Sequence, residues 1–119
     1  MADLQIKSQV LDGIPVVRLT GEIDSLNATR VKTVLDALVE ADHPSVLIDM
    51  VALADIDSSG LGVLVAALKK TTDRDGTISL IDPPTDVATM LSITGLDKLF
   101  SIFGDEAEAL SSARRSLVS

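Results

Sequence analysis

Short apolar segments of strand length alternate with segments of helical periodicity along almost the whole chain. The most apolar of the short segments is Val46-Leu47-Ile48-Asp49-Met50, which has the composition of a strand covered on both faces in a parallel sheet. Segments with helical periodicity precede and follow it. Because parallel strands are joined by right-handed crossovers, this alternation predicts a mainly parallel sheet that is covered by helices.

The chain opens differently, with two strands joined by a tight turn. Residues 4–10 alternate apolar and polar side chains, Asp12-Gly13 is a hairpin turn, and residues 15–19 form a second strand, so these two strands are predicted to be antiparallel. The remaining predicted elements are a helix over 27–40, a strand over 46–50, a helix over 58–70, a strand over 77–81, a helix from Thr85 to about Gly95, a strand over 99–103 and a helix over 105–117. The predicted fold is one α/β domain over residues 1–119, in the order ββαβαβαβα. It has a single mixed, mainly parallel sheet with an opening antiparallel hairpin and about four helices.

Three of the predicted helices begin at side chains that can accept hydrogen bonds from free N–H groups. Ser25 or Asn27 is expected to cap the first helix, Asp57 or Ser58 the second, and Thr85 the third. These caps fix where each helix starts, and they place the start of the second helix directly after a loop that follows the most apolar strand.

The charge of the chain argues against several classes of partner. Its formal net charge is −8 and no basic patch is visible, so neither a nucleic acid nor an anionic membrane surface is an expected partner. No signal peptide and no apolar run of bilayer-spanning length is found, which favours a soluble cytoplasmic protein. The absence of cysteine excludes disulfides and thiolate chemistry.

The loop from Val51 to Gly60 is where we first expect a functional site. Sites in sheets of this kind lie at the carboxyl ends of strands. A phosphate on Ser58 would lie in a favourable helix dipole and near unpaired N–H groups of the first turn, so it would change the surface charge without melting the helix. On residue type alone, a plain helix cap is the commoner interpretation of Asp57 and Ser58.

The helix after this loop has an uncharged outer face. At 100° per residue, one side carries Leu61, Leu64, Val65 and Leu68, and the side broadly opposite carries Ser59, Val63, Ala66 and Ala67. Either both sides are buried within the fold or the outer side contacts a partner, and the single predicted sheet favours the partner. Gly62 would let such a partner approach closely.

Two other kinds of site have weaker support. Asp24, Asp49, Asp55 and Asp57 could gather at one strand end and bind Mg²⁺ or Ca²⁺, but no known ligand spacing is present, so caps and solvated loop charges are the simpler interpretation. His43 is the only histidine and precedes a proline in a predicted surface turn, and the chain has neither a nucleophile elbow nor a phosphate-binding glycine loop. We therefore expect no catalytic residue, no metal and no cofactor.

A family resemblance rests on motifs that occur in order along the chain. They are Gly21-Glu22-Ile23-Asp24, Leu47-Ile48-Asp49-Met50, Asp57-Ser58-Ser59-Gly60-Leu61-Gly62 and Thr94-Gly95-Leu96-Asp97-Lys98-Leu99-Phe100. With these motifs the chain resembles the STAS-domain family (sulfate transporter and anti-sigma-factor antagonist) over nearly its whole length, and the third motif is the most specific. Because it has no membrane segment, it is more similar to the free-standing bacterial antagonists than to the domains of anion transporters.

The resemblance implies a non-enzymatic partner switch. In the unphosphorylated form such an antagonist binds an anti-sigma factor, which is an ATP-using serine kinase, and thereby frees the sigma factor. Phosphorylation of the serine that follows the aspartate, here Ser58, ends this binding, and a PP2C-type phosphatase that uses Mn or Mg resets the cycle. Together with the helix face above, the expected partner-binding residues are Asp24, Asp57, Ser59, Gly60, Leu61, Gly62, Val63 and Ala66.

A second function class stays open beside the switch. A STAS module can serve as a scaffold in a stressosome-like or transport-associated complex. Higher-order assembly would favour the scaffold, whereas the switch is expected to be a monomer or a weak dimer.

Overall fold

The computed structural model describes residues 3–41 and 45–118, with side chains described as far as Arg115. The elements follow the predicted order, with one short 3₁₀ helix added. They are β1 (Gln5–Leu11), β2 (Ile14–Ile23), α1 (Ala28–Glu40), β3 (Ser45–Ile56), α2 (Ser58–Thr72), β4 (Thr77–Ile81), α3 (Thr85–Thr94), η1 (Leu96–Lys98), β5 (Ser101–Phe103) and α4 (Glu106–Val118).

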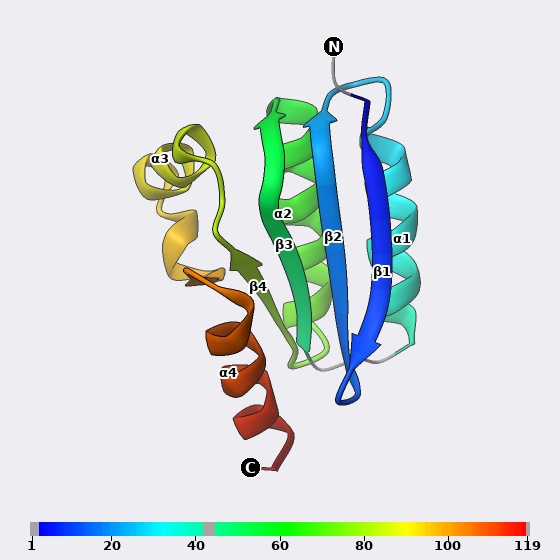
Figure 1. Cartoon of the computed structure of the whole chain (residues 1–119), viewed down its shortest axis with the longest axis vertical. Coiled ribbons are helices and arrows are strands. Elements are labelled where there is room, and N and C mark those ends of the chain that lie inside the picture. Colours follow the sequence, from blue (N-terminus) through cyan, green and yellow to red (C-terminus); the bar gives the residue numbers. More distant parts are fainter. Residues whose placement is uncertain (1–2, 42–44, 119) are drawn as a thin grey trace.

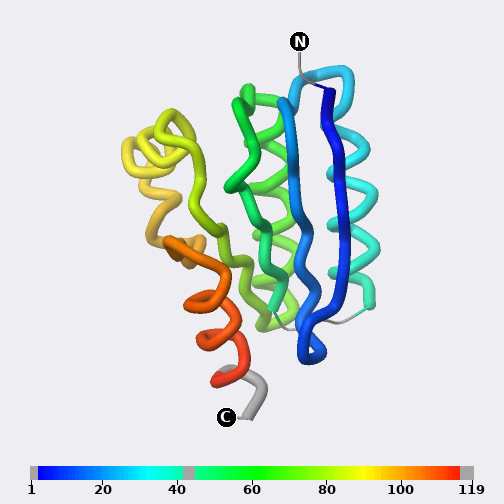
Figure 2. The backbone as a smooth tube through the Cα atoms, in the orientation of Figure 1, coloured from blue at the N-terminus to red at the C-terminus, as the bar shows by residue number. Residues whose placement is uncertain are grey.

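The strands form one mixed sheet in the order β1-β2-β3-β4-β5, so each strand pairs with its neighbours in sequence (Figures 1 and 2). β1 and β2 are antiparallel, and all other pairs are parallel. The turn between β1 and β2 is the predicted Asp12-Gly13 pair, with φ of 54° and 79°, as a tight hairpin turn requires. The predicted fold class is therefore confirmed.

Successive side chains of a strand point to opposite faces of the sheet, and each face has its own hydrophobic core. Val17 and Leu19 of β2 belong to the larger core, which is covered by α1 and α2, side by side behind the sheet in Figure 1. Ile14 and Val16 of β2 point to the opposite face and pack under α4, with Ala109 among the buried residues. Further along β2, Thr20 is exposed and Glu22 is half-buried, so the second part of β2 is more open than the first.

Strand β3 is longer than the apolar run that predicted it. Only Ser45 to Asp49 pair with β4, whereas β3 continues to pair with β2 as far as Ile56, after register irregularities. The second half of β3 therefore has a strand on one side only, and exposed residues such as Val51 interrupt its run of buried residues. Conversely, the last strand is shorter than predicted, because Leu99 and Phe100 still donate their N–H groups to the carbonyl of Leu96 in η1.

One predicted helix cap is wrong, and another is right in position only. Thr85 is the first residue of α3 rather than its cap, and the cap position is held by Pro84 without a side-chain hydrogen bond. Asn27 does hold the cap position of α1, but its side chain does not cap that helix. It binds the loop before the helix instead, as described below.

Candidate functional site at the carboxyl edge of β2 and β3

Two loops meet at the carboxyl edge of the sheet, one between β2 and α1 and the other between β3 and α2. The last residues of the two strands, Ile23 and Ile56, are register partners. The N–H of Asp57 donates to the carbonyl oxygen of Ile23 at 3.1 Å. The residues that follow, Asp24 in one loop and Ser58 at the start of α2, are thus held at the same edge.

Asp57 caps α2. Its backbone is extended, with φ of −93° and ψ of −175°. Its Oδ1 accepts the N–H groups of Ser59 at 2.9 Å and Gly60 at 3.2 Å, so the predicted cap is confirmed. The same bonds correct one expectation, because these two N–H groups are already occupied and are not free to bind a phosphate on Ser58.

Ser58 is the first residue of α2, and its side chain is exposed. Among the side chains that the structure describes, none is hydrogen-bonded to its hydroxyl. Since Asp57 carries the cap, the Ser58 hydroxyl is not needed to start the helix. Ser59, the next residue, is half-buried.

The outer side of α2 is narrower than the sequence indicates. Gly62 and Ala66 are exposed and lie in line with Ser58, and we call these three residues the outer stripe of α2. Leu61 and Val63 are half-buried and pack against the larger core. The placement of Ala67 on the outer side is wrong, because Ala67 is 2% exposed and belongs to the larger core.

Gly60 is buried beneath this surface, although it was expected among the partner-binding residues. A Cβ added there would lie 2.5 Å from Cγ1 of Ile56 and 2.7 Å from Cγ2 of Ile23. By contrast, a Cβ on Gly62 would enter open space. Gly60 therefore allows α2 to approach the strand ends, and Gly62 leaves room on the outer stripe.

The loop after β2 is folded around Asp24. Its Oδ1 accepts the N–H groups of Leu26 at 2.9 Å and Asn27 at 3.1 Å. The Asn27 side chain accepts the N–H of Asp24 at 2.9 Å and donates to the carbonyl of Glu22 at 3.0 Å. Leu26, which is 89% exposed, was not predicted as a functional residue. Its signal was an apolar residue among polar ones in a loop.

Comparison with known proteins gives the family. The family model of the STAS domain matches residues 5–109. The chain belongs to the STAS-domain family. It is 30% identical over 111 residues to the anti-sigma F factor antagonist of Paenibacillus polymyxa, covering 91% of this chain and 93% of the relative. It is also 30% identical over 105 residues to the anti-sigma-B factor antagonist of Listeria monocytogenes, covering 88% and 91%. Among solved structures, an anti-sigma factor antagonist from Mycobacterium paratuberculosis superposes with a TM-score of 0.85 at 28% identity, covering 94% of this chain and 95% of the other.

The acidic residues of this STAS domain do not all gather at the candidate site. Asp49 lies within β3, where its Oδ2 is 3.4 Å from Nε of Arg18. Arg18 also pairs with Glu106 at the start of α4, so this cluster attaches α4 to the sheet. In the part of the chain that the structure describes, no group of three or more acidic, histidine or cysteine side chains is arranged to hold a metal ion. His43 lies outside the described residues.

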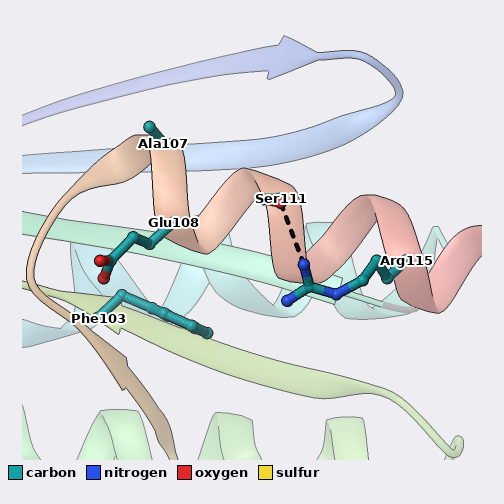
Figure 3. A pocket seen from close by; sticks show the side chains of 5 residues that line it. All are labelled: Phe103, Ala107, Glu108, Ser111 and Arg115. Atoms are coloured by element: carbon teal, nitrogen blue, oxygen red, sulfur yellow. Dashed lines mark hydrogen bonds between the residues drawn. The ribbon is translucent and has the colours of Figure 1, made fainter.

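The STAS domain has a pocket at a different place, between β5 and α4. It has a volume of about 450 Å³ and is lined by Phe103, Ala107, Glu108, Ser111 and Arg115 (Figure 3). Arg115 donates from Nη1 to Oγ of Ser111 at 3.2 Å across one turn of α4. No residue of the two loops at the carboxyl edge lines it, so it is separate from the candidate site.

Among the helices that the structure describes, none is long and apolar enough to cross a membrane.

Proposed function

We propose that this STAS domain, acting as a single domain over residues 1–119, is an anti-sigma-factor antagonist that works by partner switching in the cytoplasm. In the unphosphorylated form it binds an anti-sigma factor with serine kinase activity and displaces the sigma factor. Phosphorylation of Ser58 ends the binding, and a PP2C-type phosphatase restores it. The names of the relatives from Paenibacillus polymyxa and Listeria monocytogenes support the antagonist function.

The observation that carries the proposal is that Asp57, and not Ser58, caps α2. Asp57 caps α2 with two hydrogen bonds, while the neighbouring Ser58 is exposed. A kinase can therefore reach the hydroxyl, and phosphorylation leaves the cap in place. The fold is kept and only the surface changes, as a switch between partners requires.

The charge of a phosphate on Ser58 would stay on the surface. Because Asp57 occupies the N–H groups of Ser59 and Gly60, these donors are unavailable to neutralise the added charge of about −1.5 to −2. The outer stripe has no long side chain, so a partner can pack closely on it. In such a close contact, a phosphate on Ser58 would lose its hydration and would be repelled by an acidic or apolar partner surface, so the complex would be weakened. A loss of ~3–4 kcal/mol corresponds to several-hundred-fold weaker binding.

The proposal is tested by measuring the affinity of the chain for a candidate anti-sigma serine kinase from the same genome. Ser58→Asp is expected to weaken binding strongly and to leave the sigma factor bound to the kinase. Ser8→Asp, which adds the same charge on the exposed edge strand β1, is the matched control and should bind like the wild type. Equal affinity of Ser58→Asp and the wild type would contradict the switch, and large assemblies that do not bind the kinase would favour the scaffold.

A further inference from the structure

Leu26 is the most exposed of the large hydrophobic residues that the structure describes. Its side chain is 89% exposed, compared with 65% for Leu99. A single exposed leucine is common on protein surfaces and by itself indicates little. Leu26 differs in how it is held and in where it lies.

The loop that carries Leu26 is fixed by hydrogen bonds. The carboxylate of Asp24 accepts the N–H of Leu26 itself, and the side chain of Asn27 ties the loop to the main chain of Asp24 and Glu22. The backbone of such a preorganised loop loses little conformational freedom when the side chain that it carries is buried in a complex. Leu26 is thus presented in a form that favours binding.

Leu26 lies at the same edge of the sheet as Ser58. Its loop follows Ile23, whose carbonyl accepts the N–H of Asp57. Helices α1 and α2 pack together and both begin at this edge (Figure 1). A protein that covers Ser58 and the outer stripe of α2 therefore reaches the neighbourhood of Leu26.

We propose that Leu26 is an anchor that inserts into an apolar pocket of the serine kinase, and that Asp24 is the positioning residue that presents it. This inference rests on the proposed function. Burial of a leucine that is otherwise exposed contributes to affinity, and a few such anchors dominate the energy of an interface. Asp24 was expected to contact the partner directly; its Oδ1 accepts two N–H groups of its own loop, and in this proposal it acts through Leu26 instead.

The first experiment compares two leucine truncations of the full chain in binding to the kinase. Leu26→Ala is expected to raise the dissociation constant about tenfold, which corresponds to about 1.4 kcal/mol. Leu99→Ala is the matched control, because Leu99 lies beside Leu68 and Thr72 near the carboxyl-terminal end of α2, the opposite end of that helix from Ser58. Both variants should keep the thermal stability of the wild type, since both side chains are exposed.

A second pair of variants tests the role of Asp24. Asp24→Asn keeps an oxygen that can accept the N–H of Leu26, so it is expected to bind the kinase nearly as well as the wild type. Asp24→Ala removes the acceptor and is expected to bind about as weakly as Leu26→Ala. The double variant Asp24→Ala/Leu26→Ala should be little weaker than Leu26→Ala alone, because the first change acts through the second residue.

The outcomes separate this inference from the proposed function. If the wild type binds the kinase and Ser58→Asp does not, but Leu26→Ala binds like the wild type, the anchor is overturned and the switch stands. If Asp24→Asn is as weak as Asp24→Ala, Asp24 acts by its charge and its positioning role is overturned. If the wild type does not bind the kinase at all, both the proposed function and the anchor role of Leu26 are contradicted.

Discussion

The main-chain N–H of Asp57 donates to the carbonyl oxygen of Ile23 at 3.1 Å, and this bond joins the two loops of the candidate site. It extends the pairing of β2 with β3 by one residue beyond the register pair Ile23 and Ile56. As a result, the helix that begins with Ser58 starts beside the loop that carries Asp24 and Leu26. The site is built by backbone pairing, so surface side chains can change there without loss of the fold.

The two glycines at the start of α2 are predicted to respond oppositely to the same substitution. Gly60→Ala should lower the free energy of unfolding by ~1–3 kcal/mol, because its Cβ would press on Ile23 and Ile56. Gly62→Ala should raise it by ~0.5–1 kcal/mol, because the methyl group enters open space and alanine favours a helix. Urea denaturation of both variants measures the difference, and equal stability would show that α2 does not pack so closely on the strand ends.

The cap of α2 is predicted to depend on the acceptor oxygen of Asp57 more than on its charge. Asp57→Ala removes the acceptor for Ser59 and Gly60 and should cost about 1 kcal/mol of unfolding free energy. Asp57→Asn keeps an acceptor and should cost only a few tenths of that amount. Thermal unfolding of the two variants checks this, and an Asp57→Ala variant as stable as the wild type would argue against the cap.

An ion-pair cluster between α1 and α2 predicts a pH-dependent contribution to stability. Hydrogen bonds from Lys32 and then Lys70 hold the pKa of the Asp36 carboxyl below its ordinary value of 3.8. Because the pKa is lowered in the folded state, the stabilisation is fully present above the unfolded pKa and is lost as the pH falls through the folded one.

Asp36→Asn is therefore expected to be less stable than the wild type near pH 7, by under about 1 kcal/mol, since the pairs lie near the surface. The difference should disappear as the pH is lowered below the folded pKa of Asp36, and it should shrink in high salt. Denaturation of both proteins at a series of pH values measures it. A stability difference that grew on acidification would contradict the assignment.

Much of the fold could be predicted because local signals and long-range pairing agree. Three predicted features depend on only a few consecutive residues, and the structure contains all three. They are the Asp12-Gly13 turn, the apolar run of β3 and the Asp57 cap. The end of α3 is another such case, since Gly95 adopts φ of 78° at its carboxyl end, where the sequence places the stop.

The sequence-based predictions fail where contacts with other residues determine whether a group is buried, hydrogen-bonded or exposed. Helical periodicity alone places Ala67 outside, but Ala67 is buried in the larger core, to which residues of the sheet and of α1 also contribute. The Asp57 carboxylate takes the N–H groups that would otherwise be free for a phosphate on Ser58. Leu26 was missed because its exposure and rigid support depend on the hydrogen bonds of Asp24 and Asn27, which no periodicity encodes.

The measurement that tests the central claim most directly is the intact mass of the chain after incubation with ATP and the candidate serine kinase. The wild type, Ser58→Ala and Ser59→Ala are compared. The switch predicts one added phosphate on the wild type and on Ser59→Ala, and none on Ser58→Ala. A phosphate that persists on Ser58→Ala, or no phosphate on any of the three proteins, would contradict the claim that Ser58 is the switch.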